Sequence, residues 1–327
     1  MMLIRSTALA LCCTVVLAAC SPQATQNNTA APTAPAASNA TAHAIQGETL
    51  TITTARGEVA VPLNPERVAV YDLGMLDTLH KMGVKIGASM DTVRLDYLQD
   101  AIKDTQKAGT LFEPNYEVLS AYQPQLIIVG SRMGKAFDKL NTIAPTIDMT
   151  ADTANLKESA KARITTFGQV FNKVDEATQL NGEIDAAFDA AKQAAAGKGK
   201  GLVVLVNGGK LSAYGPTSRL GGWIHKDIGV PEVDPSIKEG SHGQPISFEY
   251  LKQHNPDWLF VLDRSAAIGE EGQAAKDVLN NPLVAETNAW KKGQVVYLIA
   301  GSYLAAGGAQ QLVDSANQLT TAFNAAK

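Results

Sequence analysis

An internal repeat constrains the fold of this 327-residue chain more than any other feature. The segment SHGQPISFEYLKQHNPDWLFVLDR at 241–264 repeats, in its second half, the pattern of NYEVLSAYQPQLIIVGSR at 115–132. The landmarks of the two copies recur at one spacing of 132 residues: Glu117 and Glu249, Pro124 and Pro256, and Arg132 and Arg264. A single offset shared by three landmarks indicates two copies of one supersecondary unit.

Each copy predicts a short helix, a proline-marked turn and a buried strand, because LIIV and WLFV are apolar runs of strand length bounded by turn residues. The arginines, Arg132 and Arg264, then follow the carboxyl ends of the strands. Ligands of open α/β sheets bind at that edge, so two facing sheets would direct both arginines into one cleft. We therefore predict an α/β fold with two Rossmann-like lobes and a binding cleft between them.

The sequence around the repeat shows the alternation of strands and helices expected for such lobes. In the first half the expected elements are a hairpin at 49–62, strands at 67–71, 84–88 and 142–148, and helices at 73–82 and 156–171. In the second half they are strands at 201–206, 211–214 and 294–299, a helix at 274–279, a loop at 300–308 and a terminal helix from Gln310.

One long helix is expected at 174–196, where acidic residues open the segment, alanines fill it and Gly197 ends it. At 1.5 Å per residue this helix would span roughly 34 Å. Its place between the repeats favours a single connecting helix between an N-terminal lobe at 48–173 and a C-terminal lobe at 197–327. The alternative is an ordinary helix packed within one lobe.

The first residues predict export. Residues 1–19 hold one arginine and then an apolar run too short to span a membrane, which is typical of a signal peptide. Cys20 follows Leu-Ala-Ala, a pattern that resembles the bacterial lipobox and implies cleavage before Cys20 and diacylation of its sulfur. Residues 20–47 would then be the lipidated cysteine and a disordered tether. An uncleaved anchor would give the same location, outside the cytoplasmic membrane.

Charge and motifs limit the function classes. The formal net charge of −4 provides no basic field for nucleic acid. The sequence has no nucleophile elbow, P-loop, dinucleotide fingerprint, zinc-protease motif or catalytic cysteine, so we expect no enzyme and no intrinsic cofactor. A hydrolase remains the alternative from another class.

Three arginines are candidates for the cleft, because Arg219 precedes a helix in the second half and joins Arg132 and Arg264. Two cations about 6 Å apart repel by about 3 kcal/mol at an effective dielectric near 20, so such a site suits a multiply anionic ligand. The alternative is that each arginine pairs with a nearby acid, such as Asp263 beside Arg264. The repeat symmetry favours a cleft position for Arg132 and Arg264 only.

Two pairs of residues complete the candidates. His242, in a glycine-flanked loop, and Tyr303, beyond a strand end, are side chains that bind Fe(III) well. Two exposed loop side chains are an equally good interpretation. Glu117 and Glu249 would lie at helix starts on the two lobes, where they either dock to basic sockets of a partner or stabilise the helix ends by about 0.3 to 1 kcal/mol.

The segments 241–264, GPTSR at 215–219, GSY at 301–303 and the lipobox closely resemble the siderophore-binding lipoproteins of ABC importers. More narrowly, the chain is similar to the FetB and CeuE type of ferric-enterobactin-binding protein, which are class III, or cluster A, substrate-binding proteins. The resemblance covers about residue 48 to the end. It implies two Rossmann-like lobes joined by one long helix, limited hinge closure and delivery of an iron chelate to a membrane permease.

The resemblance also implies a role for each candidate residue. His242 and Tyr303 match the family's iron-coordinating pair, Arg132, Arg219 and Arg264 match its catecholate-binding arginines, and Glu117 and Glu249 match its permease-docking glutamates. The ligand would be an Fe(III)-siderophore, and the protein a monomer held to a bacterial membrane by its lipid. The same scaffold could instead bind haem, a corrinoid or a hydroxamate chelate.

Overall fold

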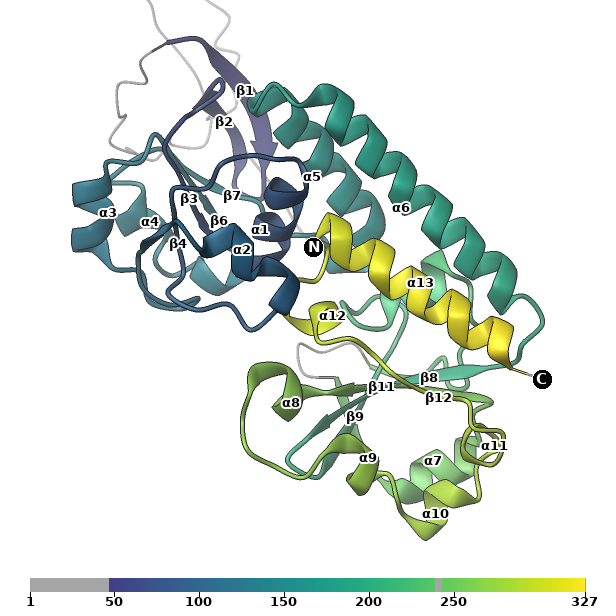
Figure 1. Cartoon of the computed structure of the whole chain (residues 1–327). Helices are drawn as coiled ribbons and strands as arrows, with labels where there is room; N and C mark the ends of the chain where they lie inside the picture. The colour runs from purple at the N-terminus through teal and green to yellow at the C-terminus, as the bar shows by residue number, and fades with distance from the viewer. Residues whose placement is uncertain (1–46, 239–242, 327) are drawn as a thin grey trace, which may run out of the picture. The chain divides into compact units, whose positions relative to one another are not determined.

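The computed structural model describes residues 47–238 and 243–326, which belong to one compact unit (Figure 1). The strands are β1 (Thr49–Thr54), β2 (Gly57–Pro62), β3 (Val68–Tyr71), β4 (Ala88–Ser89), β5 (Gln106–Lys107), β6 (Leu126–Val129), β7 (Thr146–Asp148), β8 (Gly201–Asn207), β9 (Lys210–Tyr214), β10 (Gln244–Ile246), β11 (Trp258–Asp263) and β12 (Val295–Tyr297).

The longer helices are α1 (Leu73–Lys81), α3 (Tyr116–Tyr122), α5 (Leu156–Val170), α6 (Val174–Ala195), α7 (Phe248–His254) and α13 (Ala309–Ala325). The shorter ones are α2 (Gln99–Ile102), α4 (Phe137–Leu140), α8 (Arg264–Ile268), α9 (Ala275–Val278), α10 (Pro282–Ala285), α11 (Asn288–Lys291) and α12 (Gly301–Leu304). Single turns are η1 (Asp96–Leu98), η2 (Ser131–Met133), η3 (Thr153–Asn155) and the π-helical η4 (Trp223–Asp227).

The strands form two five-stranded sheets and a hairpin of β1 and β2, which confirms the predicted α/β fold with two lobes. The first sheet, in the order β5-β4-β3-β6-β7, is parallel throughout. The second has the order β10-β9-β8-β11-β12, and β9 runs antiparallel to both β8 and β10. Gly208 and Gly209, at φ of 54° and 81°, form the tight turn between β8 and β9. No crossover helix is therefore needed at this edge, and the second sheet departs from a Rossmann pattern there.

The sequence repeat is a structural repeat. Helices α3 and α7 begin after Asn115 and Ser247, whose side chains each accept a hydrogen bond from a backbone N–H of the first turn. Both helices end at a left-handed residue, Gln123 at φ 53° and Asn255 at φ 42°. Strands β6 and β11 follow at the same distance. The two copies thus share their cap, their length of seven residues and their exit.

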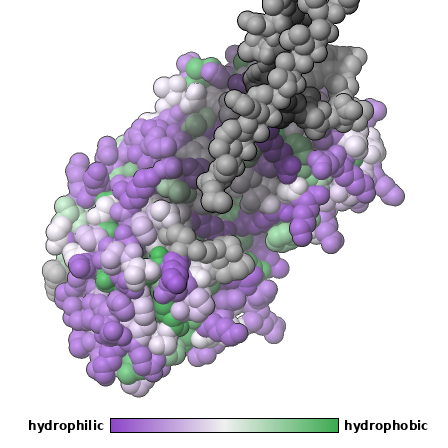
Figure 2. Space-filling model, turned by 180° about the vertical axis from the view of Figure 1, so that it is seen from behind, coloured by the Kyte–Doolittle hydropathy of each residue, from purple (hydrophilic) through white to green (hydrophobic). Residues whose placement is uncertain are grey.

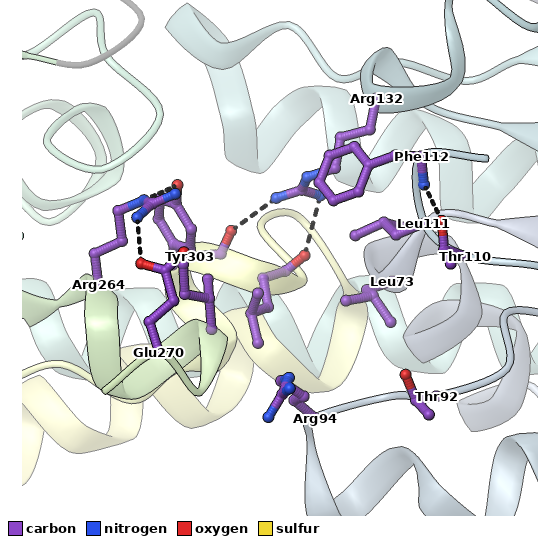
Figure 3. A pocket seen from close by; sticks show the side chains of 12 residues that line it. Leu73, Thr92, Arg94, Thr110, Leu111, Phe112, Arg132, Arg264, Glu270 and Tyr303 are labelled. Atoms are coloured by element: carbon purple, nitrogen blue, oxygen red, sulfur yellow. Dashed lines mark hydrogen bonds and ion pairs between the residues drawn. The ribbon is translucent and has the colours of Figure 1, made fainter. Parts of the chain in front are cut away.

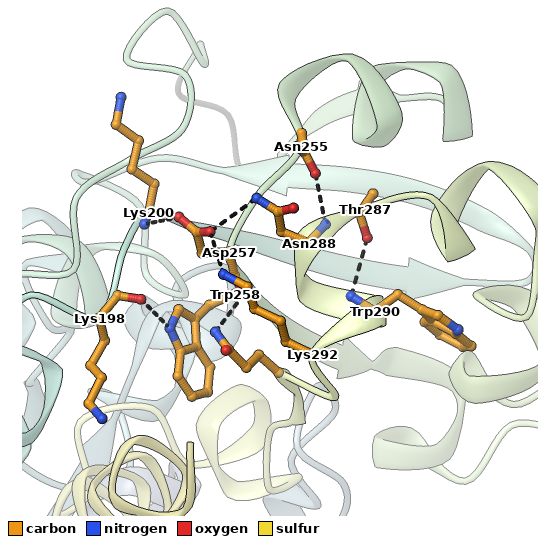
Figure 4. A network of polar contacts seen from close by, with 10 residues as sticks. Lys198, Lys200, Asn255, Asp257, Trp258, Thr287, Asn288, Trp290 and Lys292 are labelled. Carbon is orange, nitrogen blue, oxygen red and sulfur yellow. Dashed lines mark hydrogen bonds and ion pairs between the residues drawn. The ribbon is translucent and has the colours of Figure 1, made fainter. Parts of the chain in front are cut away.

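In each copy, the side chain just before the strand also forms hydrogen bonds with the backbone that leads into the neighbouring strand. Gln125 Oε1 accepts from the backbone N–H groups of Glu66, at 2.8 Å, and Arg67, at 3.0 Å, ahead of β3. The equivalent Asp257 accepts from Lys200 N, at 3.0 Å, ahead of β8 (Figure 4). Asp257 also binds Asn288 Nδ2 at 3.2 Å, which ties α11 to the strand. The two copies therefore resemble each other in how the strand is held against its neighbour as well as in the helix.

Two long helices hold the lobes together. The chain passes from the first sheet to the second through α5 and then through α6, the long helix expected at 174–196, and α13 packs along α6 (Figure 1). Phe323, near the end of α13, packs on β11 with ring centroids 4.7 Å from Trp258 and 6.0 Å from Phe260. One hydrophobic cluster includes residues of β3 and β6 as well as β8 and β11. A core shared in this way favours limited movement of the lobes.

The start of α13 is fixed to α1 of the first lobe. The buried Asp77 carboxylate accepts from the backbone N–H groups of Gln310, at 2.8 Å, and Gln311, at 3.0 Å, and from the Tyr97 hydroxyl at 2.7 Å. Burial raises the pKa of Asp77 to about 6, although these hydrogen bonds oppose the shift. Thr78 Oγ1 accepts from Ala309 N at 3.2 Å. The terminal helix therefore bridges the two lobes.

Some predicted boundaries differ from the structure. The strand expected at 84–88 is reduced to β4 at Ala88–Ser89, because Val84 N–H donates to Leu79 O and closes the end of α1. The strand expected from 142 begins at Thr146, since Ile143 N–H still donates to Leu140 O behind α4. The loop expected at 300–308 contains the helical turn α12, which carries Tyr303.

Within the described residues, no helix is both long and apolar enough to cross a bilayer. On the face shown in Figure 2, the visible described surface is mostly hydrophilic, with hydrophobic residues scattered in small groups. Scattered exposed apolar residues are normal for a globular protein.

Candidate functional site

A cavity of about 390 Å³ lies between residues of both lobes (Figure 3). Its first-lobe side carries Arg94, Phe112 and Arg132, and its other side carries Arg264 and Glu270. Tyr303 and Leu304 of α12 lie between them. The cavity is therefore at the carboxyl ends of β6 and β11, where the repeat predicts a ligand site.

The strands position the two repeat arginines. Arg132 lies in η2, just after β6, and Arg264 opens α8 directly after β11. Asp263, the acid considered as a partner of Arg264, caps α8 instead by accepting from Ala266 N at 3.0 Å. It also accepts from Ala275 N at 2.7 Å. The acid that pairs with Arg264 is Glu270, at 3.3 Å between Nη1 and Oε2.

Three arginines converge on Tyr303. Arg132 donates from Nη2 to Tyr303 O and from Nη1 to Leu304 O, both at 3.3 Å. Arg264 donates from Nε to the Tyr303 hydroxyl at 3.1 Å. The Arg219 guanidinium lies over the tyrosine ring, 4.3 Å from its centroid, in cation–π geometry. The structure thus brings together four of the five predicted ligand-binding residues; their binding role stays a prediction.

The charges change how these groups titrate. Burial raises the pKa of Tyr303, but the hydrogen bond from Arg264 and the charge of Arg219 outweigh burial, and the pKa is lowered overall. The hydrogen bond to Tyr303 raises the pKa of Arg264. Burial lowers the pKa of Arg132, and the nearby Arg219 adds to this effect while Asp72 opposes it. The phenolate of Tyr303 therefore forms more readily than that of a free tyrosine.

A smaller chamber of about 190 Å³ continues behind Tyr303 and Arg132. Arg163 and Arg219 line it together with the single carboxylate of Asp72. Arg163 is buried and donates to Gly307 O at 2.9 Å and Met149 O at 3.0 Å, which holds the backbone ahead of α13. The positive charge of the cavity thus extends inward.

Four predicted residues remain: Cys20, His242, Glu117 and Glu249. Cys20 and His242 are outside the described residues. Glu117 and Glu249 are exposed in the first turns of α3 and α7, one on each lobe. Among the residues that the structure describes, no group of three or more His, Cys, Asp or Glu side chains is arranged to hold a metal ion.

Among the cavity residues that the sequence analysis did not single out, three carry a charge or an aromatic ring: Arg94, Phe112 and Glu270. The Arg94 guanidinium packs against Gly269, at φ +67°, where a Cβ would collide with it. Phe112 is 66% exposed at the cavity wall. Arg94 and Phe112 lie outside the repeat and have no local signal. Glu270 had a weak one, since it follows Arg264 by six residues in a glycine-bounded loop.

The sequence is similar to those of known proteins. A family profile described as "Periplasmic binding protein" matches residues 68–300. The petrobactin-binding protein YclQ of Bacillus subtilis is 40% identical over 257 residues, which are 77% of this chain and 80% of YclQ. The ferric-anguibactin-binding protein FatB of Vibrio anguillarum is 31% identical over 256 residues, which are 76% of this chain and 79% of FatB.

Known structures share this fold. The crystal structure of YclQ has a TM-score of 0.81 and 36% identity, covering 85% of this chain and 99% of that one. The periplasmic catecholate-siderophore-binding protein VctP of Vibrio cholerae has a TM-score of 0.77 and 32% identity, covering 85% and 100%. Because sequence and structure agree over most of the chain, the protein belongs to the periplasmic binding protein family.

Proposed function

We propose that this protein captures a ferric catecholate siderophore between its lobes and delivers it to an ABC permease for iron uptake. The convergence of Arg132, Arg219 and Arg264 on Tyr303 is the observation that carries the proposal. Catecholate oxygens on Fe(III) are strongly anionic, and guanidinium groups bind such oxygens through charge-assisted hydrogen bonds. Relatives named for petrobactin, anguibactin and catecholate-siderophore binding support this ligand class.

The role of Tyr303 depends on the ligand. A chelate with four donor atoms leaves two iron positions open, and Tyr303 with His242 would fill them. The lowered pKa of Tyr303 favours the phenolate needed for this bond. A chelate with six donor atoms has no open position, so both side chains would stand off the iron and the arginines alone would hold the ligand.

A titration of the purified protein with a panel of ferric chelates tests the proposal. Trp223 and Trp258 are buried, and quenching of tryptophan fluorescence reports binding. The panel comprises ferric enterobactin, ferric petrobactin, a ferric hydroxamate, haem and a corrinoid. We expect tight binding of catecholates, with a catecholate-to-iron charge-transfer band in the visible spectrum. Binding of only the other three ligands would replace the proposed cargo while keeping the scaffold.

We propose further that the protein is a binding protein without catalytic activity. The relatives are named as binding proteins, which supports this assignment. Incubation with ester and peptide substrates is expected to give no turnover beyond that of a heat-denatured sample. Turnover that co-purifies with the protein would favour a hydrolase.

The lipid anchor is proposed from Cys20 and the preceding apolar run. Relatives of similar sequence include a probable siderophore-binding lipoprotein of Bacillus subtilis, 29% identical over 130 residues. The mature protein would face the periplasm or the cell surface as a monomer. Cys20→Ser should move the protein from the membrane fraction to the soluble exported fraction. Retention of the variant in the membrane fraction would contradict lipidation at Cys20.

A further inference from the structure

We propose that Glu270 is a specificity-determining residue. Its carboxylate is an internal counter-ion of Arg264 that opposes anionic ligands, so it sets affinity according to ligand charge. The inference rests on the proposed function, because it concerns the same cavity, and it adds a residue whose effect on affinity is unfavourable.

The Glu270 carboxylate lies where a ligand anion would. Its Oε2 is 3.3 Å from Arg264 Nη1, and both residues line the cavity (Figure 3). Arg264 directs its Nε to the Tyr303 hydroxyl, so the same guanidinium contacts the predicted iron-binding residue. An anionic group that reaches Arg264 from the cavity therefore meets a negative charge already in place.

The backbone of Glu270 is held firmly while its side chain is not. Its N–H donates to Ser265 O at 2.9 Å at the end of α8, and the preceding Gly269 is packed against Arg94 of the other lobe. The carboxylate itself is 59% exposed, and exposed ion pairs contribute little, about 0 to 1 kcal/mol. A ligand can therefore displace the carboxylate from Arg264 but cannot move it far from the cavity.

A negative charge kept at the cavity opposes anionic ligands in proportion to their charge. A trianionic tris-catecholate complex of Fe(III) should feel this opposition most, and a monoanionic bis-catecholate complex should feel it less. The carboxylate also neutralises one of the crowded arginines while the cleft is empty, which lowers their mutual repulsion. Glu270 would thus keep small anions out and prevent the highly charged chelate from binding too tightly for release.

The test compares Glu270→Gln with Glu271→Gln. Glu271 is exposed, does not line the cavity and makes no ion pair within the described part of the chain, so its substitution changes net charge equally. Fluorescence titrations would use a ferric tris-catecholate and a ferric bis-catecholate. In Glu270→Gln we expect affinity to rise about thirtyfold for the first and about threefold for the second, with gains that shrink as salt increases. Glu271→Gln should stay within about twofold of the wild type.

Two outcomes would overturn the inference. Equal gains in both variants would mean a general effect of net charge, and weaker binding in Glu270→Gln would mean that the carboxylate supports the site.

A second measurement separates this inference from the proposed function. If the wild type binds no catecholate, the proposed function is wrong. The role of Glu270 can still be tested by comparing the midpoint of thermal unfolding in sulfate with that in chloride at equal ionic strength. The rise in midpoint should be larger in Glu270→Gln than in the wild type or Glu271→Gln, and an equal rise in all three would refute the counter-ion role.

Discussion

Arg132 and Arg264 occupy the same position in two copies of one unit, yet their surroundings differ. Arg132 donates to two backbone carbonyls of α12, and burial lowers its pKa. Arg264 donates to the side chains of Tyr303, Asn207 and Glu270, and the hydrogen bond to Tyr303 raises its pKa. The helix and the caps before each arginine are alike, although β11 has six residues and β6 has four.

The repeat thus places each arginine beyond its strand, whereas the residues that surround it in the tertiary structure determine its role. Backbone carbonyls cannot move away without shifting α12, so Arg132 connects the first lobe to the turn that carries Tyr303. Side-chain partners rotate at little cost, so Arg264 can exchange them for a ligand. We expect the first arginine to support both structure and binding and the second to support binding alone.

The largest expected effect is that of Arg132→Ala. It removes a cation from the cavity and leaves two carbonyls without their donor, so chelate affinity should fall on the order of a hundredfold and stability by about 1 to 2 kcal/mol. Titration with the ferric chelate and urea unfolding measure the two losses. Lys135→Ala removes an exposed positive charge three residues away and should leave both unchanged. Unchanged stability in Arg132→Ala would end the distinction between the two arginines.

A second contrast concerns α13, whose start is held by an acid of the first lobe and whose end is held by aromatic rings of the second. The folded-state pKa of Asp77, about 6, lies above its ordinary value of 3.8. The stability that protonated Asp77 contributes is therefore full below pH about 4 and is lost as the pH rises through about 6. Between these limits its contribution falls by about 1.4 kcal/mol per pH unit.

Asp77→Asn should remove this part of the pH dependence, because the amide does not titrate. Urea unfolding at several pH values between about 4 and 6 would give the free energy of unfolding for the wild type and the variant. Asp100→Asn, at an exposed position, is the matched control. Parallel pH profiles for the wild type and Asp77→Asn would contradict the prediction.

Arg264→Ala should have a smaller effect than Arg132→Ala. Affinity is expected to fall about tenfold, since one charge-assisted contact is lost. Stability should change by less than about 0.5 kcal/mol, since the ion pair with Glu270 is largely exposed. The same titration and urea unfolding measure both values. A loss of stability equal to that of Arg132→Ala would show that the two arginines do the same work.

The smallest effect on chelate affinity is expected at the helix starts of the two copies. Glu117→Ala combined with Glu249→Ala should leave chelate binding unchanged, because both side chains are exposed outside the cavity. Iron-siderophore uptake by cells should nevertheless be lost if these glutamates dock to the permease. The control variant Glu66→Ala with Glu271→Ala also removes one exposed carboxylate from each half of the chain and should retain uptake. Normal uptake in the Glu117 and Glu249 variant would leave only helix stabilisation as their role.

The repeated unit was predictable from sequence because its determinants are local. A short helix, a proline-marked turn and an apolar run of strand length depend on a few neighbouring residues, and the 132-residue offset showed that they occur twice. The long helix at Val174–Ala195 was predictable for the same reason. The position of the two arginines beyond their strands followed from these elements.

The sequence by itself therefore determined the two lobes, the connecting helix and the edge of the sheets where a ligand can bind. Only the tertiary structure decided that Arg132 reaches the backbone of Tyr303, that Asp77 holds α13 and that Glu270 pairs with Arg264 inside the cavity. The first two contacts join residues more than 170 positions apart. Such contacts depend on how separate elements pack against one another, and packing leaves no periodic or local mark in the sequence.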